Sequence, residues 1–417
     1  MAKILYLSSE IPALSETFVY REVLALRSLG LDIETASVRS PASDLGEDAL
    51  TELAQSTRPI YSLGFARTCA DVLSESRHHF VRTLSTLSRV MRDALFSTDV
   101  SATGRPKVVW QGLAAIGLAS RLRSTDIGHI HCHFADVPTT IGMYVALQLG
   151  ITFSFTGHAN DLFPGRSLLK EKLQRALFVN CISAWHRRFY QSIVARDDDA
   201  LPIVRCGVDL SVCTETPAPA GDSLRVLGVG RLVPKKGFDV LLRAVRAIAL
   251  SGGPSIQVTL VGGGVCEAEL RKLADAVPEP ARIEMLGETQ NQRVIELMGQ
   301  ADVFVLPCRI TASGDRDGIP VVLMEAMARG RCVIAGDLET IRELVEDQVS
   351  GILIPPGDQS ELERVLTSLA ADRSRIDLLG QAGRRRVKEE FSLDLNAARM
   401  RDKLASHGLV AAGKSLG

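Results

Sequence analysis

The sequence lacks any hydrophobic run long enough for a membrane-spanning helix. Such a helix takes roughly 18 to 20 consecutive apolar residues, and no stretch of the 417 residues approaches that length. The first residues, MAKILYLSSEIP, run directly into a strand-like segment without the basic start, longer apolar region and cleavage site of a secretory signal. The sequence therefore predicts a cytoplasmic protein and leaves open peripheral binding at the inner face of the cytoplasmic membrane.

A strong net charge and paired cysteines are also absent. The 48 Lys and Arg residues offset 49 Asp and Glu residues, so the chain has no basic global field with which to bind nucleic acid. Its eight cysteines are scattered singly, with no Cys-x-x-Cys pair, a usage typical of buried thiols in a reducing compartment. These absences argue against a nucleic-acid partner and against a disulfide framework.

The turn after the first strand-like run lacks the glycines of a dinucleotide-binding protein. Its sequence is LSSEIPALSE, whereas such a site needs Gly-x-Gly-x-x-Gly at this place. The glycines at 228 and 230, and those at 262–264, fail the required spacing as well. The sequence therefore argues against a nicotinamide-dependent dehydrogenase.

Short β-branched runs alternate with helix-length segments along the whole chain, which predicts parallel βαβ units and an α/β fold. In the first half the expected strands are KILYLSS, LDIETASV, GHIHCHFA, TFSFTG, LFVNCIS and LPIVRCG. In the second half they are LRVLGVG, IQVTLVGGG, RIEMLG, ADVFVLPC, RCVIAG and GILIPPG. Helices are expected at 16–29, at 238–250, near 320–329 and from residue 360 onward.

The chain length suits two α/β cores better than one. Between residues 211 and 223 the segment SVCTETPAPAGDS interrupts the alternation with prolines and small residues, as a linker does. The sequence therefore predicts a first domain at 1–212, a linker at 213–222 and a second domain at 223–392. Residues 393–417 are expected to form a helix that returns to the first domain, followed by a tail.

An amphipathic helical segment lies between residues 64 and 107. Its apolar side chains recur at three- and four-residue spacing and are Leu73, Phe80, Leu84, Leu87, Met91 and Leu95. Basic side chains follow one flank, at His78, Arg82, Arg89 and Arg92. Two interpretations stay open: a solvated flank of a helix packed on the first domain, or a flank that meets anionic lipid or a lipid-diphosphate acceptor.

Two cations lie where the second domain begins. The strand LRVLGVG ends at Gly230-Arg231, and Lys236-Gly237 opens the following helix. A helix N-terminus favours an anion through its free amides and its dipole, and a guanidinium with an ammonium there suits the two charges of a diphosphate. Arg231 and Lys236 are the predicted phosphate ligands.

Two carboxylates follow further along the same domain. Asp317 precedes the expected helix and Glu325 lies inside it, about two helical turns away, so both can face one side. Such a pair can accept hydrogen bonds from hydroxyls at two separated places, as a nucleotide sugar presents them. Glu325 stands between Met324 and Ala326 in an apolar helix, where an acidic residue usually has a partner.

Taken together, these motifs resemble the retaining glycosyltransferases of family 4, and most closely their bacterial exopolysaccharide and colanic-acid branch. The resemblance covers essentially the whole chain. In chain order the motifs are Ser15-Glu16-Thr17-Phe18, His133-Phe134-Ala135, Gly157-His158-Ala159-Asn160-Asp161, Cys206-Gly207-Val208-Asp209, Gly230-Arg231 with Lys236-Gly237, and Asp317 through Glu325-Ala326-Met327. The family implies the GT-B fold, with two Rossmann-like domains facing across a cleft.

The resemblance also implies donor-binding roles. Arg231 and Lys236 would bind the donor diphosphate, Glu325 the ribose, and Asp317 the donor sugar. Gly318 and Ile319 would lie in the donor site, and Ile341 beside the diphosphate in the loop 337–341. Family members usually have glutamate at the first acidic position, so the shorter Asp317 leaves the identity of the sugar open.

In the first domain, His158 follows the strand TFSFTG, and open α/β sheets place ligands at the carboxyl ends of strands. It resembles the family histidine near the reacting sugar, with an expected hydrogen bond to a donor hydroxyl or the leaving phosphate. Glu16 and Thr17 are candidate acceptor residues, although Glu16 equally suits a first-turn acid. Ser15 suits the N-cap of the helix that follows.

Three histidines, His129, His131 and His133, alternate along one strand and share a face, a pattern that admits a metal site. No fourth ligand follows nearby, and the family works without a metal, so none is expected. His133, closest to the strand end, is the histidine expected to reach the acceptor or the donor.

The function implied is metal-independent hexosyl transfer with retention, from a nucleotide-diphosphate sugar to a glycan or polyprenyl-diphosphate-linked acceptor. No cofactor is expected besides this donor substrate. A nucleotide-sugar epimerase of the same fold is the nearer alternative. A non-enzymatic membrane-surface scaffold is the other, and it leaves Arg231, Lys236, Asp317 and Glu325 unexplained. The nucleotide, the sugar, the linkage and the oligomeric state stay open.

Overall fold

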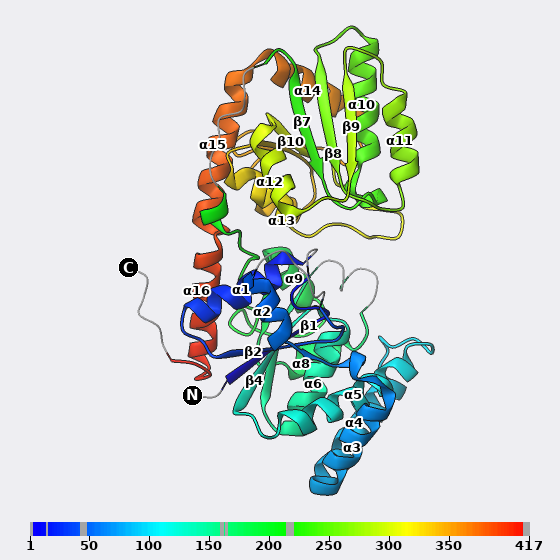
Figure 1. The fold of residues 1–417 in the computed structure, drawn as a ribbon, viewed down its shortest axis with the longest axis vertical. Helices are drawn as coiled ribbons and strands as arrows, with labels where there is room; N and C mark the ends of the chain where they lie inside the picture. The colour runs from blue at the N-terminus through cyan, green and yellow to red at the C-terminus, as the bar shows by residue number, and fades with distance from the viewer. Residues whose placement is uncertain are drawn as a thin grey trace. The chain divides into compact units, whose positions relative to one another are not determined.

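A computed structural model describes residues 3–13, 16–41, 48–158, 162, 166–213 and 221–411. The chain forms two compact units (Figure 1): unit 1 comprises Met1–Gly207 with Leu393–Gly417, and unit 2 comprises Val208–Ser392. Each unit contains a six-stranded sheet in which every pairing between named strands is parallel. The predicted fold class, α/β with two parallel sheets, is confirmed.

Unit 1 has the strand order β3-β2-β1-β4-β5-β6, in which the direction of winding reverses between β1 and β4, the place where such sheets bind ligands. Its strands are β1 Lys3–Ser8, β2 Ile33–Ser37, β3 Arg58–Pro59, β4 Ile127–His133, β5 Thr152–Gly157 and β6 Val179–Cys181. Its helices of the α type are α1 Thr17–Ser28, α2 Asp48–Ser56, α3 Gly64–His78, α4 Phe80–Phe96, α5 Arg105–Leu122, α6 Val137–Leu149, α8 Leu169–Arg175, α9 Ala184–Gln191 and α16 Leu393–Ser406.

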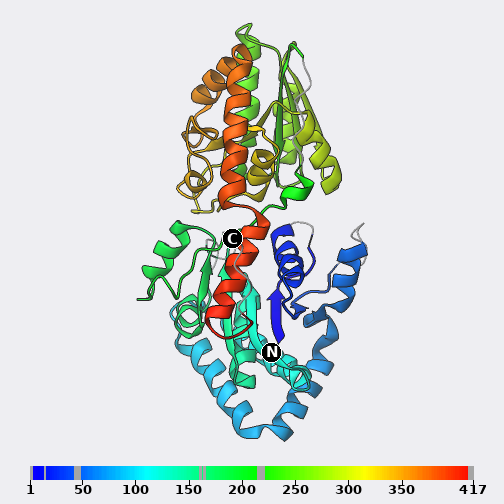
Figure 2. The ribbon, with the colours of Figure 1, turned by 90° about the vertical axis from the view of Figure 1, so that its left-hand side faces the viewer.

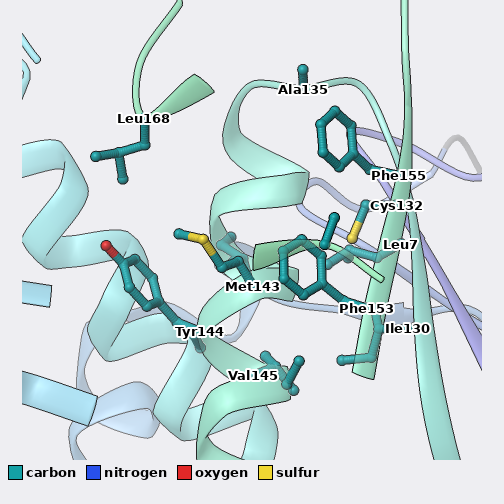
Figure 3. Close-up of a cluster of buried hydrophobic side chains, with 14 of the residues drawn as sticks. Leu7, Ile130, Cys132, Ala135, Met143, Tyr144, Val145, Phe153, Phe155 and Leu168 are labelled. Carbon is teal, nitrogen blue, oxygen red and sulfur yellow. The ribbon is translucent and has the colours of Figure 1, made fainter. Parts of the chain in front are cut away.

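The core of unit 1 forms where α6 packs closely on the sheet (Figure 3). Strands covered on both faces need nearly continuous apolar residues, and Leu7, Ile130 and Phe155 are fully buried. A Cβ atom on Gly142 of α6 would overlap the sulfur of Cys132 on β4. The close approach of this helix to the strand therefore requires glycine at that position.

Unit 2 repeats the same winding, with the strand order β12-β11-β10-β7-β8-β9. Its strands are β7 Leu224–Val229, β8 Ile256–Val261, β9 Arg282–Gly287, β10 Val303–Leu306, β11 Cys332–Gly336 and β12 Ile352–Ile354. Its helices are α10 Phe238–Leu250, α11 Glu267–Asp275, α12 Asn291–Gln300, α13 Val321–Ala328, α14 Gln359–Ala371 and α15 Arg373–Glu390. Because β7 and β10 are neighbours, the loops that follow these two strands meet at one edge of the sheet.

The C-terminal helix returns to the first unit, as the sequence predicted. Helix α16 packs against α1 (Figures 1 and 2), where Met400 and Leu404 join the same buried cluster as Val23. The side chain of Asn396 accepts a hydrogen bond of 2.9 Å from the backbone N–H of Arg205. Apolar burial and this polar contact hold the helix on unit 1.

The strand expected at 201–207 is absent. The segment pairs with β6 only through an isolated bridge between Cys181 and Ile203. Pro202 has no N–H to donate to a ladder, and the side chain of Asn180 takes up the next backbone groups, with bonds of 3.0 Å from the Val204 N–H and 3.1 Å to its carbonyl oxygen. Three backbone hydrogen bonds join this segment to β6, from Val179 N–H to the Ala200 carbonyl, from Cys181 N–H to the Pro202 carbonyl and from Val204 N–H to the Cys181 carbonyl. The apolar run therefore pairs with β6 at one bridge and does not extend into a strand.

The amphipathic segment forms two helices, α3 and α4, which contact each other and α5. Most of its apolar stripe points outward: Leu73, Phe80, Leu84, Met91 and Leu95 are exposed, and Leu87 is half-buried. The helices pack on α5 and α6 through their opposite faces, and the basic flank is exposed, which fits the interpretation of a solvated flank on a helix packed against the first domain. The other interpretation, contact of this flank with anionic lipid or a lipid-linked acceptor, stays a prediction. Among the described residues, no helix is both long enough and apolar enough to cross a membrane.

Three stretches of sequence interpretation lie outside the described residues. They are Ser15, the Ala159-Asn160-Asp161 part of the motif after β5, and the end of the expected C-terminal tail, at 412–417. Most of the expected linker lies outside them as well, at 214–220. The N-cap residue of α1 is Glu16, whose side chain makes no capping hydrogen bond.

Candidate functional site

The basic turn after β7 has a backbone that only glycine allows at one point. Pro234–Lys236 form a single 3-10 turn, and Gly237 then caps α10 with a φ of 70°. A Cβ atom on Gly237 would overlap the carbonyl oxygen of Pro307, just beyond β10. Both the left-handed backbone and this close approach require glycine, so the turn is pressed against the loop that follows β10.

At this edge of the sheet two lysines meet two aspartates, which we name the lysine–aspartate cluster (Lys235, Lys236, Asp315 and Asp317). The Lys236 ammonium lies 2.8 Å from Asp317 Oδ2. The Lys235 ammonium lies 3.0 Å from Asp315 Oδ1 and 3.7 Å from Asp317 Oδ1. Lys235, Lys236 and Asp317 are all buried, so the cluster concentrates charge in a weakly hydrated place.

The sequence identified Lys236 and Asp317 but not their ion pair, and it missed Lys235 and Asp315. The signal lay in a Lys-Lys pair after β7 and an Asp-x-Asp pair in the loop after β10. Only the strand order, which makes β7 and β10 neighbours, brings the two pairs together.

The Lys236–Asp317 pair is ionised at neutral pH. Burial by itself would raise the pKa of the Asp317 carboxyl, but the Lys236 charge, a 3.0 Å hydrogen bond from the Cys308 thiol and the Lys235 charge together hold that pKa below its ordinary value. Burial likewise opposes the charge of Lys236, yet Asp317 raises the pKa of its ammonium. Each member of the pair keeps the other charged.

This pairing predicts how stability depends on pH. The pKa of Asp317 is lower in the folded protein than its unfolded value of about 3.9. The ionised form therefore adds stability above that pH, and the contribution is lost as the pH falls through the folded pKa. Asp317→Asn should have a shallower loss of unfolding free energy below about pH 4, measured by urea denaturation at a series of pH values. Parallel pH curves for the two proteins would contradict the assignment.

Other predicted donor residues surround the cluster. Arg231 is exposed, and its charge is close enough to work against the raised pKa of Lys236. The Thr340 hydroxyl donates a 3.1 Å hydrogen bond to the backbone carbonyl of Asp317, which fixes the loop 337–341 beside it. Ile341 in that loop is fully buried, and its N–H is bonded to the Leu338 carbonyl at 2.9 Å.

Helix α13 places the remaining donor candidates. It begins at Val321 after the N-cap residue Pro320, so Gly318 and Ile319 lie in the loop between Asp317 and the helix. Gly318 is buried and Ile319 is half-buried. Glu325 lies in the middle of the helix and is half-buried.

In unit 1, His133 and His158 are stacked at the ends of β4 and β5. His133 Nδ1 lies 3.2 Å from His158 Nε2, and the two ring centroids are 5.5 Å apart. Burial holds the pKa of His158 well below its usual range, so its ring is neutral. Phe134, next to His133, has a φ of 70°, an uncommon backbone for a bulky residue and one often found at functional sites.

A carboxylate that the sequence did not single out joins these histidines. Glu22 of α1 accepts a 3.0 Å hydrogen bond from the Tyr6 hydroxyl, and its Oε1 lies 3.5 Å from His133 Nε2. Glu22, His131 and His133 form a group whose ligand atoms lie within 4.8 Å of one another. Both ring nitrogens of His131 are already bonded to hydroxyls, at 2.8 Å to Ser154 and 3.0 Å to Thr156.

The acceptor candidates Glu16 and Thr17 lie at the start of α1, on the same helix as Glu22. Thr17 is the first residue of the helix, and both it and Glu16 are half-buried. Phe18, the next residue, packs on the ring of His158 with centroids 4.6 Å apart. Within unit 1, the structure therefore brings the first loop and both predicted histidines together.

Two doubly wound parallel-sheet units, one with a basic turn after its first strand, define the GT-B class of protein. Residues 215–386 match the family model "Glycosyl transferases group 1". The putative colanic acid biosynthesis glycosyltransferase WcaL of Escherichia coli K12 is 27% identical over 409 residues, 91% of this chain and 94% of that one.

A shorter match has higher identity. The amylovoran biosynthesis glycosyltransferase AmsK of Erwinia amylovora is 37% identical over 170 residues, which cover 40% of this chain and 41% of that relative's length. Among solved structures, Anabaena Alr3699/HepE in complex with UDP and glucose has a TM-score of 0.69 at 15% identity, with 97% of this chain and 100% of that chain covered. This likeness shows the fold.

Residues 215–386 belong to the group 1 glycosyltransferases, family 4, and the chain is distantly homologous to WcaL over most of its length. It is a nucleotide-sugar-dependent glycosyltransferase of a retaining family that transfers hexosyl groups. The predicted family, fold and class of enzyme are confirmed.

Proposed function

We propose that this protein transfers a hexosyl group, with retention and without a metal ion, to a glycan or polyprenyl-diphosphate-linked glycan during synthesis of a surface polysaccharide or glycoconjugate. The observation that carries the proposal is the lysine–aspartate cluster. Its Lys236 lies at the N-terminus of α10 with Arg231 nearby, and helix N-termini with added cations favour phosphate. The names of WcaL and AmsK, both from polysaccharide biosynthesis, support the acceptor class.

In this proposal each charged group binds a different part of the donor. Arg231 and Lys236 neutralise the diphosphate. Asp317, kept ionised by the lysines, accepts hydrogen bonds from hydroxyls of the sugar, and Glu325 accepts them from the ribose. Because Asp317 pairs with Lys236 before the donor binds, neither buried charge is left uncompensated in the free protein.

The chemistry follows a front-face displacement. The acceptor oxygen forms a bond to the anomeric carbon on the face from which the diphosphate leaves, and the acceptor proton passes to the departing diphosphate oxygen. No side-chain nucleophile takes part, so the residues act by positioning and by stabilising the charge of the leaving group. His158 would contact the donor sugar or its leaving phosphate, and Glu16, Thr17 and His133 would bind the acceptor.

A thermal-shift screen of nucleotide hexoses tests the proposal. The true donor should raise the melting temperature by mass action, and the matching nucleoside diphosphate should do so as well. With acceptor present, the enzyme should release nucleoside diphosphate and elongate the glycan. An epimerase would instead isomerise or release the sugar without an acceptor, and a scaffold would bind no nucleotide.

Removing divalent cations tests the metal-free part of the proposal. Because Arg231, Lys236 and the α10 N-terminus supply the positive charge, transfer in excess EDTA should stay essentially intact. The measurement is the initial rate of nucleoside diphosphate release with and without chelator. A complete loss that magnesium or manganese restores would contradict the metal-free mechanism.

We place this reaction at the inner face of the cytoplasmic membrane, where a polyprenyl-linked acceptor would present its glycan. The placement depends on the acceptor being lipid-linked. It fails if only a water-soluble glycan is elongated.

A further inference from the structure

Helices α3 and α4 form a hairpin whose outer surface is apolar, which we name the hairpin face. Its large exposed side chains are Phe65, Leu73, Phe80, Val81, Leu84, Met91, Leu95 and Phe96. Phe65, Val81 and Phe96 retain 69%, 80% and 79% of their full exposure. So many large apolar side chains on two adjacent helices exceed the scattered surface apolar residues of an ordinary protein.

The inward faces of the same helices are mostly polar, and partners in unit 1 satisfy them. Val90 and Ala94 of α4 are the apolar exceptions and join the core of unit 1. Glu75 on α3 pairs with Arg123 at 2.6 Å and accepts a 2.8 Å hydrogen bond from the Gln148 amide. Asp93 on α4 accepts a 2.7 Å hydrogen bond from Arg175 and one of 2.9 Å from the Tyr144 hydroxyl.

These bonds attach the hairpin to the rest of unit 1 without using its apolar stripe. The arrangement is the reverse of a helix that packs on a protein core. The fold of unit 1 therefore does not account for the hairpin face.

Charge follows the same division. Between residues 64 and 96 the acidic residues are Asp71, Glu75 and Asp93, and all three are buried. The basic side chains of this stretch are all exposed: Arg67, Arg77, His78, His79, Arg82, Arg89 and Arg92. The hairpin face thus combines apolar side chains with positive charge and carries no exposed acid.

One basic residue of this flank has a structural contact of its own. The Arg82 guanidinium donates a 2.8 Å hydrogen bond to the carbonyl oxygen of Leu149 at the end of α6. Arg89, in contrast, lines a groove of about 610 Å³ together with Met143, Leu147 and Ile151. Arg89 of α4 thus borders a partly apolar groove on α6.

We propose that the hairpin face docks on the surface of an anionic lipid bilayer. Its aromatic and aliphatic side chains would enter the boundary between headgroups and acyl chains, while Arg77, Arg89 and Arg92 bind lipid phosphates, as amphipathic basic helices do. A second copy of the chain is the poorer partner, because face-to-face pairing would set arginine against arginine with no exposed acid between them. The docking does not depend on the donor chemistry, so it can fail while the proposed function stands.

Co-sedimentation of the full chain with vesicles tests this proposal. The vesicles contain equal parts of phosphatidylglycerol and phosphatidylcholine, or phosphatidylcholine alone. Wild type should bind the anionic vesicles and bind the neutral ones much more weakly. Val81→Ser, Leu84→Ser and Met91→Ser made together should weaken binding to the anionic vesicles by about tenfold or more, since each removes apolar surface that the bilayer would cover.

Two further variants separate the electrostatic contribution to vesicle binding from the apolar one. Arg89→Gln with Arg92→Gln should remove the preference for anionic lipid and its salt dependence, while Arg82 is left intact because of its contact with Leu149. As a matched control, Leu250→Ser, Val265→Ser and Leu378→Ser remove equally exposed apolar side chains of unit 2 and should leave vesicle binding unchanged. Thermal melting and binding of nucleoside diphosphate are measured for each variant to check that it is folded.

Unchanged vesicle binding by the Val81, Leu84 and Met91 variant would overturn the proposal. So would equal losses in this variant and in the unit 2 control. Light scattering tests the alternative that a second copy of the chain covers the hairpin face. If wild type were a dimer, and the Val81, Leu84 and Met91 variant were a monomer that still bound vesicles, the partner of the hairpin face would be a second copy and the proposal would be wrong.

Discussion

Changing Lys236 to Ala should strongly destabilise the protein and weaken its binding of nucleoside diphosphate. The substitution leaves the buried Asp317 without its 2.8 Å partner, and breaking a buried ion pair from one side typically costs about 3 to 5 kcal/mol. Lys235, 3.7 Å from the other carboxylate oxygen, compensates only in part. Loss of one charge-assisted contact to the diphosphate, about 1.5 to 3 kcal/mol, corresponds to roughly 10- to 150-fold in affinity.

A double variant separates these two effects. Lys236→Ala combined with Asp317→Asn removes both charges, so most of the unfolding free energy should return. Diphosphate affinity should stay low, because the ammonium is still missing. Urea denaturation and calorimetric titration of the three variants provide the measurements. If the double variant recovered both the unfolding free energy and the affinity for nucleoside diphosphate, Lys236 would act only on the fold. If it recovered neither, the broken ion pair would not be the source of the instability.

Asp317→Asn alone should lower transfer while nucleoside diphosphate binding survives. In the proposed site Asp317 holds hydroxyls of the donor sugar, which the free nucleoside diphosphate lacks. An interaction that positions the reacting sugar is worth on the order of 100-fold in rate. Steady-state transfer measured beside calorimetric binding of the nucleoside diphosphate tests this expectation.

Glu325→Gln is the matched comparison, because it also neutralises one carboxylate without changing its size. Glu325 is assigned to the ribose, which donor and product share, so its variant should weaken the binding of both. If Asp317→Asn lost product binding as severely as Lys236→Ala while Glu325→Gln did not, the two carboxylate assignments would have to be exchanged. If none of these variants changed binding or transfer, the donor site would lie elsewhere.

The sequence predicted the fold well because its signals are local. Strand β5 has the predicted bounds of TFSFTG, and α10 begins and ends where its apolar spacing indicated. The returning C-terminal helix was predicted from the helical stretch that follows the second domain, and α16 has that course. Local patterns misled at 201–207, where Pro202 has no N–H to donate and the pairing with β6 is limited to a single bridge.

The parts of the site that sequence missed depend on contacts between distant segments. Lys235 and Asp315 are 80 residues apart, and only the order of β7 and β10 makes them neighbours. Glu22 joins His133 for a similar reason, since α1 and β4 are far apart in the chain. The roles of the individual donor and acceptor residues remain predictions.

The direction of the α3–α4 stripe was also beyond the sequence. Helical spacing shows that one face is apolar but not whether that face points inward. The outcome was decided by partners of the polar face, Arg123 and Arg175, which lie 48 and 82 residues from the acids they bind. The outward orientation of the apolar stripe thus depends on tertiary contacts, and only the structure could identify the hairpin face as an exposed surface.

The central claim is that the diphosphate of the donor binds where Arg231 and Lys236 meet. The most direct test is calorimetric titration, in EDTA, of the nucleoside diphosphate and its parent nucleoside into wild type and Arg231→Gln. This variant keeps both members of the buried Lys236–Asp317 ion pair. Arg271→Gln serves as a control at another exposed arginine of unit 2.

The account predicts that Arg231→Gln binds the nucleoside diphosphate about tenfold or more weakly, that its affinity for the nucleoside is unchanged, and that Arg271→Gln matches wild type. Equal affinity of wild type and Arg231→Gln for the nucleoside diphosphate would contradict it.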